Sequence, residues 1–108
     1  MDLAYFPVSA DEVPVGKDYS LGTVYNFKFQ YNTRRDFYTC EVSDLEGTLL
    51  YTTRLTYLSP LIHAVVDGLE FTKNLIPFDI RELNATELLH EFLTASNFDE
   101  VQLYEQPV

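Results

Sequence analysis

The chain has 108 residues, among them eight tyrosines, eight phenylalanines and a single cysteine, and its net charge is −10. This length predicts one domain, residues 1–108, and a lone cysteine excludes an intrachain disulfide. The acidic balance argues against nucleic acid and anionic membranes as partners, because a negative surface repels phosphate, and the absence of a signal-peptide pattern and of a long apolar run predicts a soluble protein made in the cytoplasm.

The first part of the chain has an uneven pattern. Residues 4–8 are typical of a short edge strand, where Pro7 is tolerated because an edge needs no N–H. A loop follows, and two glycines between residues 16 and 22 favour a turn. Few apolar residues here can anchor a core, so residues 1–23 are predicted to form an extended arm that contacts a neighbouring protein. Removing residues 1–18 should then leave the fold intact but weaken assembly.

Three strands are predicted next, over about residues 24–31, 37–42 and 48–58. Aromatic and polar residues alternate in the first of them, which is the period-two pattern of a strand with one face against a core. A polar hairpin loop at 32–36 joins the first pair, and Asp44–Gly47 has Asp first and Gly last, as a type I turn prefers. The side chains predicted to face inward are Tyr25, Phe27, Phe29, Tyr31, Tyr38, Cys40, Val42, Leu49, Tyr51, Leu55 and Tyr57.

The next stretch is less regular. Residues 61–66 form an apolar run that favours a buried strand, and residues 69–71 are predicted to form a short one. Lys73 and Asn74 favour a turn. Residues 75–80 are a further candidate strand, interrupted by Pro77.

A short helix is predicted for residues 85–95, where Asn84 is a good N-cap and Glu87 completes a capping box. Residues 101–104 are predicted to form a closing strand. The fold class is therefore mainly β, a small barrel or sandwich of about six or seven mostly antiparallel strands with one helix in the C-terminal half.

No catalytic, cofactor-binding or metal-binding residues are predicted. A zinc-protease helix needs a second histidine four residues after the first, and Thr94 occupies that position after His90. The pair Glu87 and His90 matches only half of a carboxylate di-metal site. His63 has no second ligand nearby in the sequence, and Cys40 is predicted to face inward, where a thiol is inert.

Three further patterns are explained by structure alone. Asp44–Gly47 lacks the twelve-residue alternation of oxygen ligands that a calcium loop needs. The neighbouring carboxylates Asp99 and Glu100 cannot be placed at a catalytic distance from others by sequence. The aromatic strand could stack nucleic-acid bases, but such platforms sit in a basic groove, and the nearby cations are few: Lys28, Arg34 and Arg35.

One longer pattern does point to a family. It comprises the runs Tyr25-x-Phe27-x-Phe29-x-Tyr31-Asn32, Asp36-Phe37-Tyr38-x-Cys40-x-Val42 and Asp44-Leu45-Glu46-Gly47-Thr48-Leu49-Leu50, then Leu55 through Pro60-Leu61. This arrangement resembles the baseplate plug proteins of contractile-tailed cyanophages and related tailed phages. The resemblance covers residues 25–66, and residues 98–104 resemble the end of that family.

The resemblance implies a structural protein rather than an enzyme. It implies a virion component at the centre of the tail baseplate that helps to close or organise the hub until the tail contracts. The implied partners are hub, tube or spike subunits, contacted in multiple copies, with no cofactor and no small-molecule substrate. The tyrosine content agrees, because tyrosine is enriched at protein interfaces.

Two other hypotheses stay open. An acidic adaptor or inhibitor could bind a basic protein inside the cell, and such a complex should weaken steeply as salt rises. An enzyme subunit could instead share carboxylates with a neighbouring chain, although the sequence contains no nucleophile–base constellation.

Overall fold

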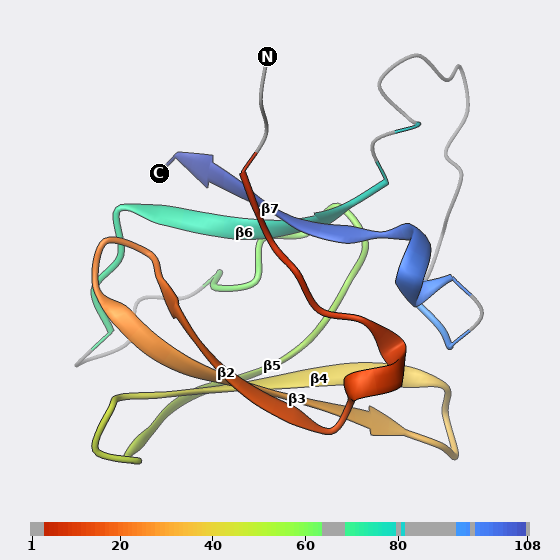
Figure 1. Cartoon of the computed structure of the whole chain (residues 1–108), viewed down its shortest axis with the longest axis horizontal. Helices are drawn as coiled ribbons and strands as arrows, with labels where there is room; N and C mark the ends of the chain where they lie inside the picture. The colour runs from red at the N-terminus through yellow and green to blue at the C-terminus, as the bar shows by residue number, and fades with distance from the viewer. Residues whose placement is uncertain (1–3, 64–68, 80, 82–92, 96, 108) are drawn as a thin grey trace.

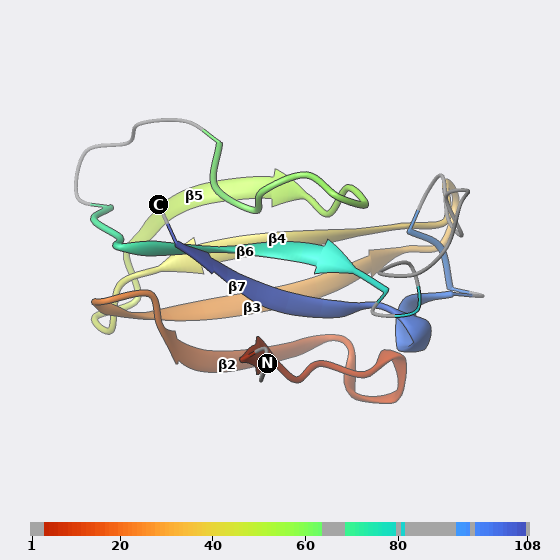
Figure 2. The same ribbon diagram turned by 90° about the horizontal axis from the view of Figure 1, so that it is seen from above.

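The computed structural model describes residues 4–63, 69–79, 81, 93–95 and 97–107. Within these residues two antiparallel sheets lie one above the other, with strand orders β1-β7-β6 and β2-β3-β4-β5 (Figures 1 and 2). The strands are β1 (Tyr5–Phe6), β2 (Val15–Ser20), β3 (Val24–Asn32), β4 (Phe37–Ser43), β5 (Leu49–Arg54), β6 (Lys73–Phe78) and β7 (Gln102–Pro107). The mainly-β prediction is confirmed, and the open sheets fit a small sandwich rather than a closed barrel.

The larger sheet is built on the alternating segment. Tyr25, Phe27 and Phe29 of β3 are buried, while Asn26 and Lys28 between them are less buried. On β4, Tyr38, Cys40 and Val42 point inward, as predicted. The predicted hairpin loop at residues 32–36 and the turn at Asp44–Gly47 are both present, the turn with a Gly47 N–H donating to the Asp44 carbonyl at 3.1 Å.

Aromatic side chains from both sheets meet in the core. Phe6 of β1 stacks on Tyr19 of β2, with ring centroids 4.4 Å apart. The same ring meets Phe27 and Phe29 edge-on, at 5.5 and 5.6 Å. Edge-to-face contact is a favoured arrangement for aromatic rings. A two-residue strand therefore joins the smaller sheet to the larger one.

The prediction that the N-terminal segment has few core anchors is wrong for residues 4–23. Phe6, Val8 and Leu21 are buried. Of the turn predicted between residues 16 and 22, only residues 21–22 bend, and residues 16–20 belong to the strand β2, which pairs with β3 over its whole length. Alternation in β2 is hard to detect because its inner positions are only half buried and one of them is Lys17.

The segment before β6 also differs from the prediction. Residues 69–71 are irregular rather than a strand, and Lys73 and Asn74 begin β6 rather than form a turn. The buried Asn74 side chain accepts the Ile62 and Leu75 N–H groups at 3.1 and 2.9 Å and donates to the Ile62 carbonyl at 2.6 Å. Those bonds satisfy its amide group, which is why a turn-forming residue is tolerated inside a strand.

Pro77 lies inside β6, which is an edge strand, where a missing N–H is tolerated. Its carbonyl accepts the Leu58 N–H at 2.9 Å. Of the strand predicted over residues 61–66, residues 61–63 are irregular, and residues 64–66 lie outside the described residues. The helix predicted over residues 85–95 also falls mostly outside them, and residues 93–95, which are described, are not helical.

Candidate functional site

Among the described residues, the side chains considered for chemistry do not form a metal-ligand group. Cys40 is fully buried in β4, and burial raises the pKa of its thiol, as expected for an inert cysteine. His63 is exposed, with its ring Nδ1 3.5 Å from the Tyr51 hydroxyl. Glu87 and His90 lie outside the described residues. Within the described part of the chain no three His, Cys, Asp or Glu side chains are grouped as metal ligands, and no helix there could span a membrane.

The acidic pairs from the sequence hold loops in place. Asp44 Oδ1 accepts the N–H groups of Glu46 and Thr48, at 3.0 and 2.9 Å, and so closes the β4–β5 turn. Asp99 Oδ1 accepts the Ala10 N–H at 2.7 Å. Glu100 Oε2 lies 3.3 Å from Arg81 Nη2 and forms an ion pair with it. These contacts give the carboxylates structural roles.

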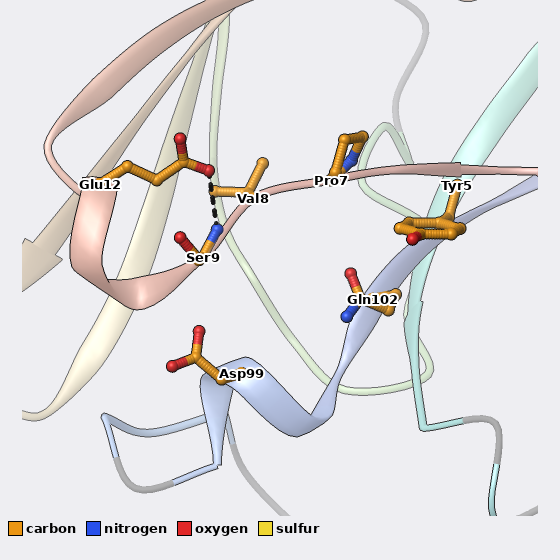
Figure 3. Close-up of a pocket in the computed structure, with 7 residues that line it drawn as sticks. All are labelled: Tyr5, Pro7, Val8, Ser9, Glu12, Asp99 and Gln102. Carbon is orange, nitrogen blue, oxygen red and sulfur yellow. Dashed lines mark hydrogen bonds between the residues drawn. The ribbon is translucent and has the colours of Figure 1, made fainter.

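A hollow of about 390 Å³ separates the N-terminal segment from the start of β7 (Figure 3). It is lined by Tyr5, Pro7, Val8, Ser9, Glu12, Asp99 and Gln102. Glu12 Oε1 accepts the Ser9 N–H at 2.9 Å and the Lys17 ammonium at 2.8 Å, which together lower the pKa of the Glu12 carboxyl, Lys17 most strongly. The hollow is open to solvent, and its two carboxylates already stabilise the surrounding backbone.

A polar cluster bridges the two sheets beside the core. The Tyr19 hydroxyl of β2 donates to the Glu105 carboxylate of β7, which also accepts from Lys73 Nζ of β6 at 2.9 Å. The Tyr19 bond is the main cause that lowers the pKa of Glu105. Burial, followed by the bond to Glu105, raises the pKa of Tyr19. One carboxylate therefore links three strands from both sheets.

Three exposed aliphatic side chains lie at one end of the larger sheet, and we call Val24, Leu45 and Leu49 the apolar corner. Their exposed fractions are 42%, 63% and 54%. Ser43 of β4 pairs with Asn26 on one side and with Leu49 on the other, so the start of β3, the β4–β5 turn and the start of β5 meet at this end.

A β-bulge explains why Leu49 is outside. The prediction that Leu49 faces inward is wrong, because the register of β4 and β5 shifts between Val42 and Ser43. A bulge re-aims the side chains beside it. Leu50 packs against the core, and Leu49 is exposed. Further along the chain than the bulge, Leu55 and Tyr57 are buried, as predicted.

The corner borders a second hollow, of about 350 Å³, lined by Asp18, Asn26, Ser43, Asp44, Leu45 and Gly47. Period-two alternation cannot reveal a bulge, so the sequence pattern did not predict this surface. One signal was available, because Leu45 sits inside a predicted turn between two acidic residues, where a large apolar side chain has no core to enter.

Comparison with known proteins returns one family. The family model described as cyanophage baseplate Pam3 plug gp18 matches residues 3–105, which is nearly the whole chain. No curated protein and no solved structure matches the chain.

Proposed function

Because the chain belongs to the cyanophage baseplate plug family, we propose that it works as a single domain, residues 1–108, that closes or organises the central hub of a tail baseplate until the tail contracts. Membership of this family implies a structural role in the virion tail. Hub, tube or spike subunits are the proposed partners, contacted by multiple copies of the chain after synthesis in the host cytoplasm. The match over residues 3–105 is the observation that carries the proposal.

The physical properties of the described residues support a docking role. The apolar corner exposes large aliphatic groups, and the net charge of −10 favours partners with basic surfaces. The carboxylates Asp44 and Asp99 bind backbone N–H groups, so they act in loop structure rather than as free acids or bases. We infer that the chain is not an enzyme.

Deletion of the gene from its phage tests the proposal. Tails of the deletion phage, imaged by cryo-electron microscopy, should lack density at the centre of the baseplate, and a plasmid copy of the gene should restore it. Mass spectrometry of purified wild-type virions should detect the chain. Virions that never contain the chain, or baseplates that are complete without it, would contradict the proposed function.

The acidic adaptor is the second candidate, and the net charge of −10 is the observation that favours it. An adaptor held mainly by charge would bind a basic protein in the infected cell and would be absent from the virion. Salt dependence separates it from a packed virion contact.

A further inference from the structure

We propose that the apolar corner is where another baseplate subunit docks, through an apolar segment flanked by lysine or arginine. This inference rests on the proposed function and adds the surface and the chemistry of the partner. Val24, Leu45 and Leu49 come from two strands and a turn, and the strand register places all three at the same end of the larger sheet. Single exposed apolar residues are normal on proteins, whereas a group of them beside a hollow is typical of interaction sites.

The local backbone keeps these side chains exposed. Leu45 is held in a turn that Asp44 closes with two hydrogen bonds, and the bulge beside Ser43 directs Leu49 away from the core. Both features are built into the larger sheet rather than into a separate loop. The corner is therefore already formed in the isolated chain, and a preorganised surface loses little entropy on binding.

The surrounding charge selects the occupant. Asp18 and Asp44 line the hollow, and Glu46 lies in the same turn as Leu45. Within the described residues none of the three forms an ion pair with a lysine or arginine. The lysine on the same strand as Val24 is Lys28, which pairs across the sheet with Glu41 on β4.

A second copy of the chain fits this surface poorly. It would bring the same carboxylates against themselves and add a further net charge of −10. A basic flank on a different subunit would instead meet Asp18 and Glu46, while its apolar residues cover Leu45 and Leu49. Charge would then set the register, and the aliphatic contact would supply most of the affinity.

The experiment adds purified chain back to tails isolated from the deletion phage and measures binding by co-sedimentation. The corner variant carries Leu45→Ser and Leu49→Ser, both at exposed positions, so its urea midpoint should match the wild type. Its binding should fall about tenfold or more, as expected for the loss of apolar contacts at the centre of an interface. The matched control carries Tyr5→Ser and Leu58→Ser, which are also exposed but lie elsewhere, and it should bind like the wild type.

A charge variant with Asp18→Asn and Glu46→Gln should bind more weakly and show a smaller salt dependence than the wild type. A corner variant that binds as tightly as the wild type would overturn the inference and leave the proposed function standing. Failure of the wild-type chain itself to bind the tails would instead contradict the proposed function. Self-association of the wild type that the corner variant abolishes, seen by sedimentation velocity, would show that the occupant is a second copy.

Discussion

Two glycines among the described residues have positive φ angles, and only one of them is packed against a neighbour. Gly22 has φ of +101°, and a Cβ there would lie 2.4 Å from Thr72 Oγ1. Gly47 has φ of +92°, with open space where its Cβ would be. The Gly47→Ala variant should therefore show only the backbone cost, about 1–2 kcal/mol. The Gly22→Ala variant should lose more, measured as the free energy of unfolding in urea.

Thr72 provides the control for this comparison. Its N–H donates to the Leu21 carbonyl at 2.7 Å, and this backbone contact survives Thr72→Ala. In the Thr72→Ala background the cost of Gly22→Ala should fall toward that of Gly47→Ala, because the nearest clashing atoms are gone. Equal costs for the two glycine variants in the wild-type background would show that packing against Thr72 is unimportant.

The Tyr19–Glu105 bond predicts how stability changes with pH. The pKa of Glu105 is lowered from 4.5 in the folded protein, so its contribution is present above about pH 4.5 and is lost as pH falls through the folded value. The pKa of Tyr19 is raised from 10.0, so its contribution is present below pH 10 and is lost as pH rises through its folded value. The cluster stabilises the fold between these limits.

Tyr19→Phe removes the hydroxyl and keeps the ring that stacks on Phe6. It should lower the free energy of unfolding by about 1 kcal/mol at neutral pH and flatten its decline between about pH 5 and 3. Urea titrations across that range measure both effects. Tyr51→Phe, which loses only two 3.5 Å contacts with the Nδ1 and the backbone N–H of His63, is the control. If the free energy of unfolding of Tyr19→Phe declines between about pH 5 and 3 as steeply as that of the wild type, the Tyr19–Glu105 bond is not the cause of this decline.

Among the secondary-structure elements, period-two alternation predicted the strands whose two faces differ sharply in polarity. From Tyr25 to Phe29 in β3 and from Tyr38 to Ser43 in β4, the inner residues are buried and the outer ones are polar, so period two was sufficient. In β2 the inner position Lys17 is polar, and its ammonium group reaches Glu12 instead of the core. In β6 the buried Asn74 is satisfied by Ile62, a contact that is distant in sequence. Such strands are specified by tertiary partners, which local patterns do not contain.

The same limit applies to the candidate site. The family was predictable, because motifs and spacing are local. The position of Leu49 was not, because a register shift between β4 and β5 decides it. Asp99 and Ala10 are also brought together only by the fold.

The smallest strand should contribute strongly to stability. Phe6 is 2% exposed and contacts three rings of the larger sheet, whereas Tyr5 beside it is 46% exposed. Phe6→Ala should lower the free energy of unfolding by about 3–5 kcal/mol, the usual range for a buried phenylalanine. Tyr5→Ala should cost far less, and urea unfolding measures both variants. Similar losses in the two variants would mean that Phe6 does not join the sheets.

This contrast also changes the expectation for truncation. A chain without residues 1–18 loses Phe6 and most of β2, which pairs with β3 over six residues. We now expect that truncated chain to unfold rather than to retain the fold. Assembly is therefore better tested by substitutions at exposed positions.

At the scale of the whole molecule, added salt weakens attraction through the net charge but does not weaken contact at the apolar corner. A charge of −10 attracts a basic partner over a range that shrinks from about 8 Å at physiological ionic strength to about 3 Å at 1 M salt. Apolar contact at Leu45 and Leu49 is not weakened by this screening. The salt dependence of retention in the virion therefore reports which of the two effects holds the chain in place.

Purified virions washed in about 1 M sodium chloride should keep the chain, measured by quantitative mass spectrometry relative to tail-tube protein. Virions assembled with the Leu45→Ser and Leu49→Ser variant should lose it in the same wash, because only the screened charge contacts remain. A wash at physiological salt is the control, and both forms should stay bound there. Steep loss of the wild-type chain in high salt would instead show that charge rather than the apolar corner holds it in the virion, since a contact held by charge dissociates when its field is screened.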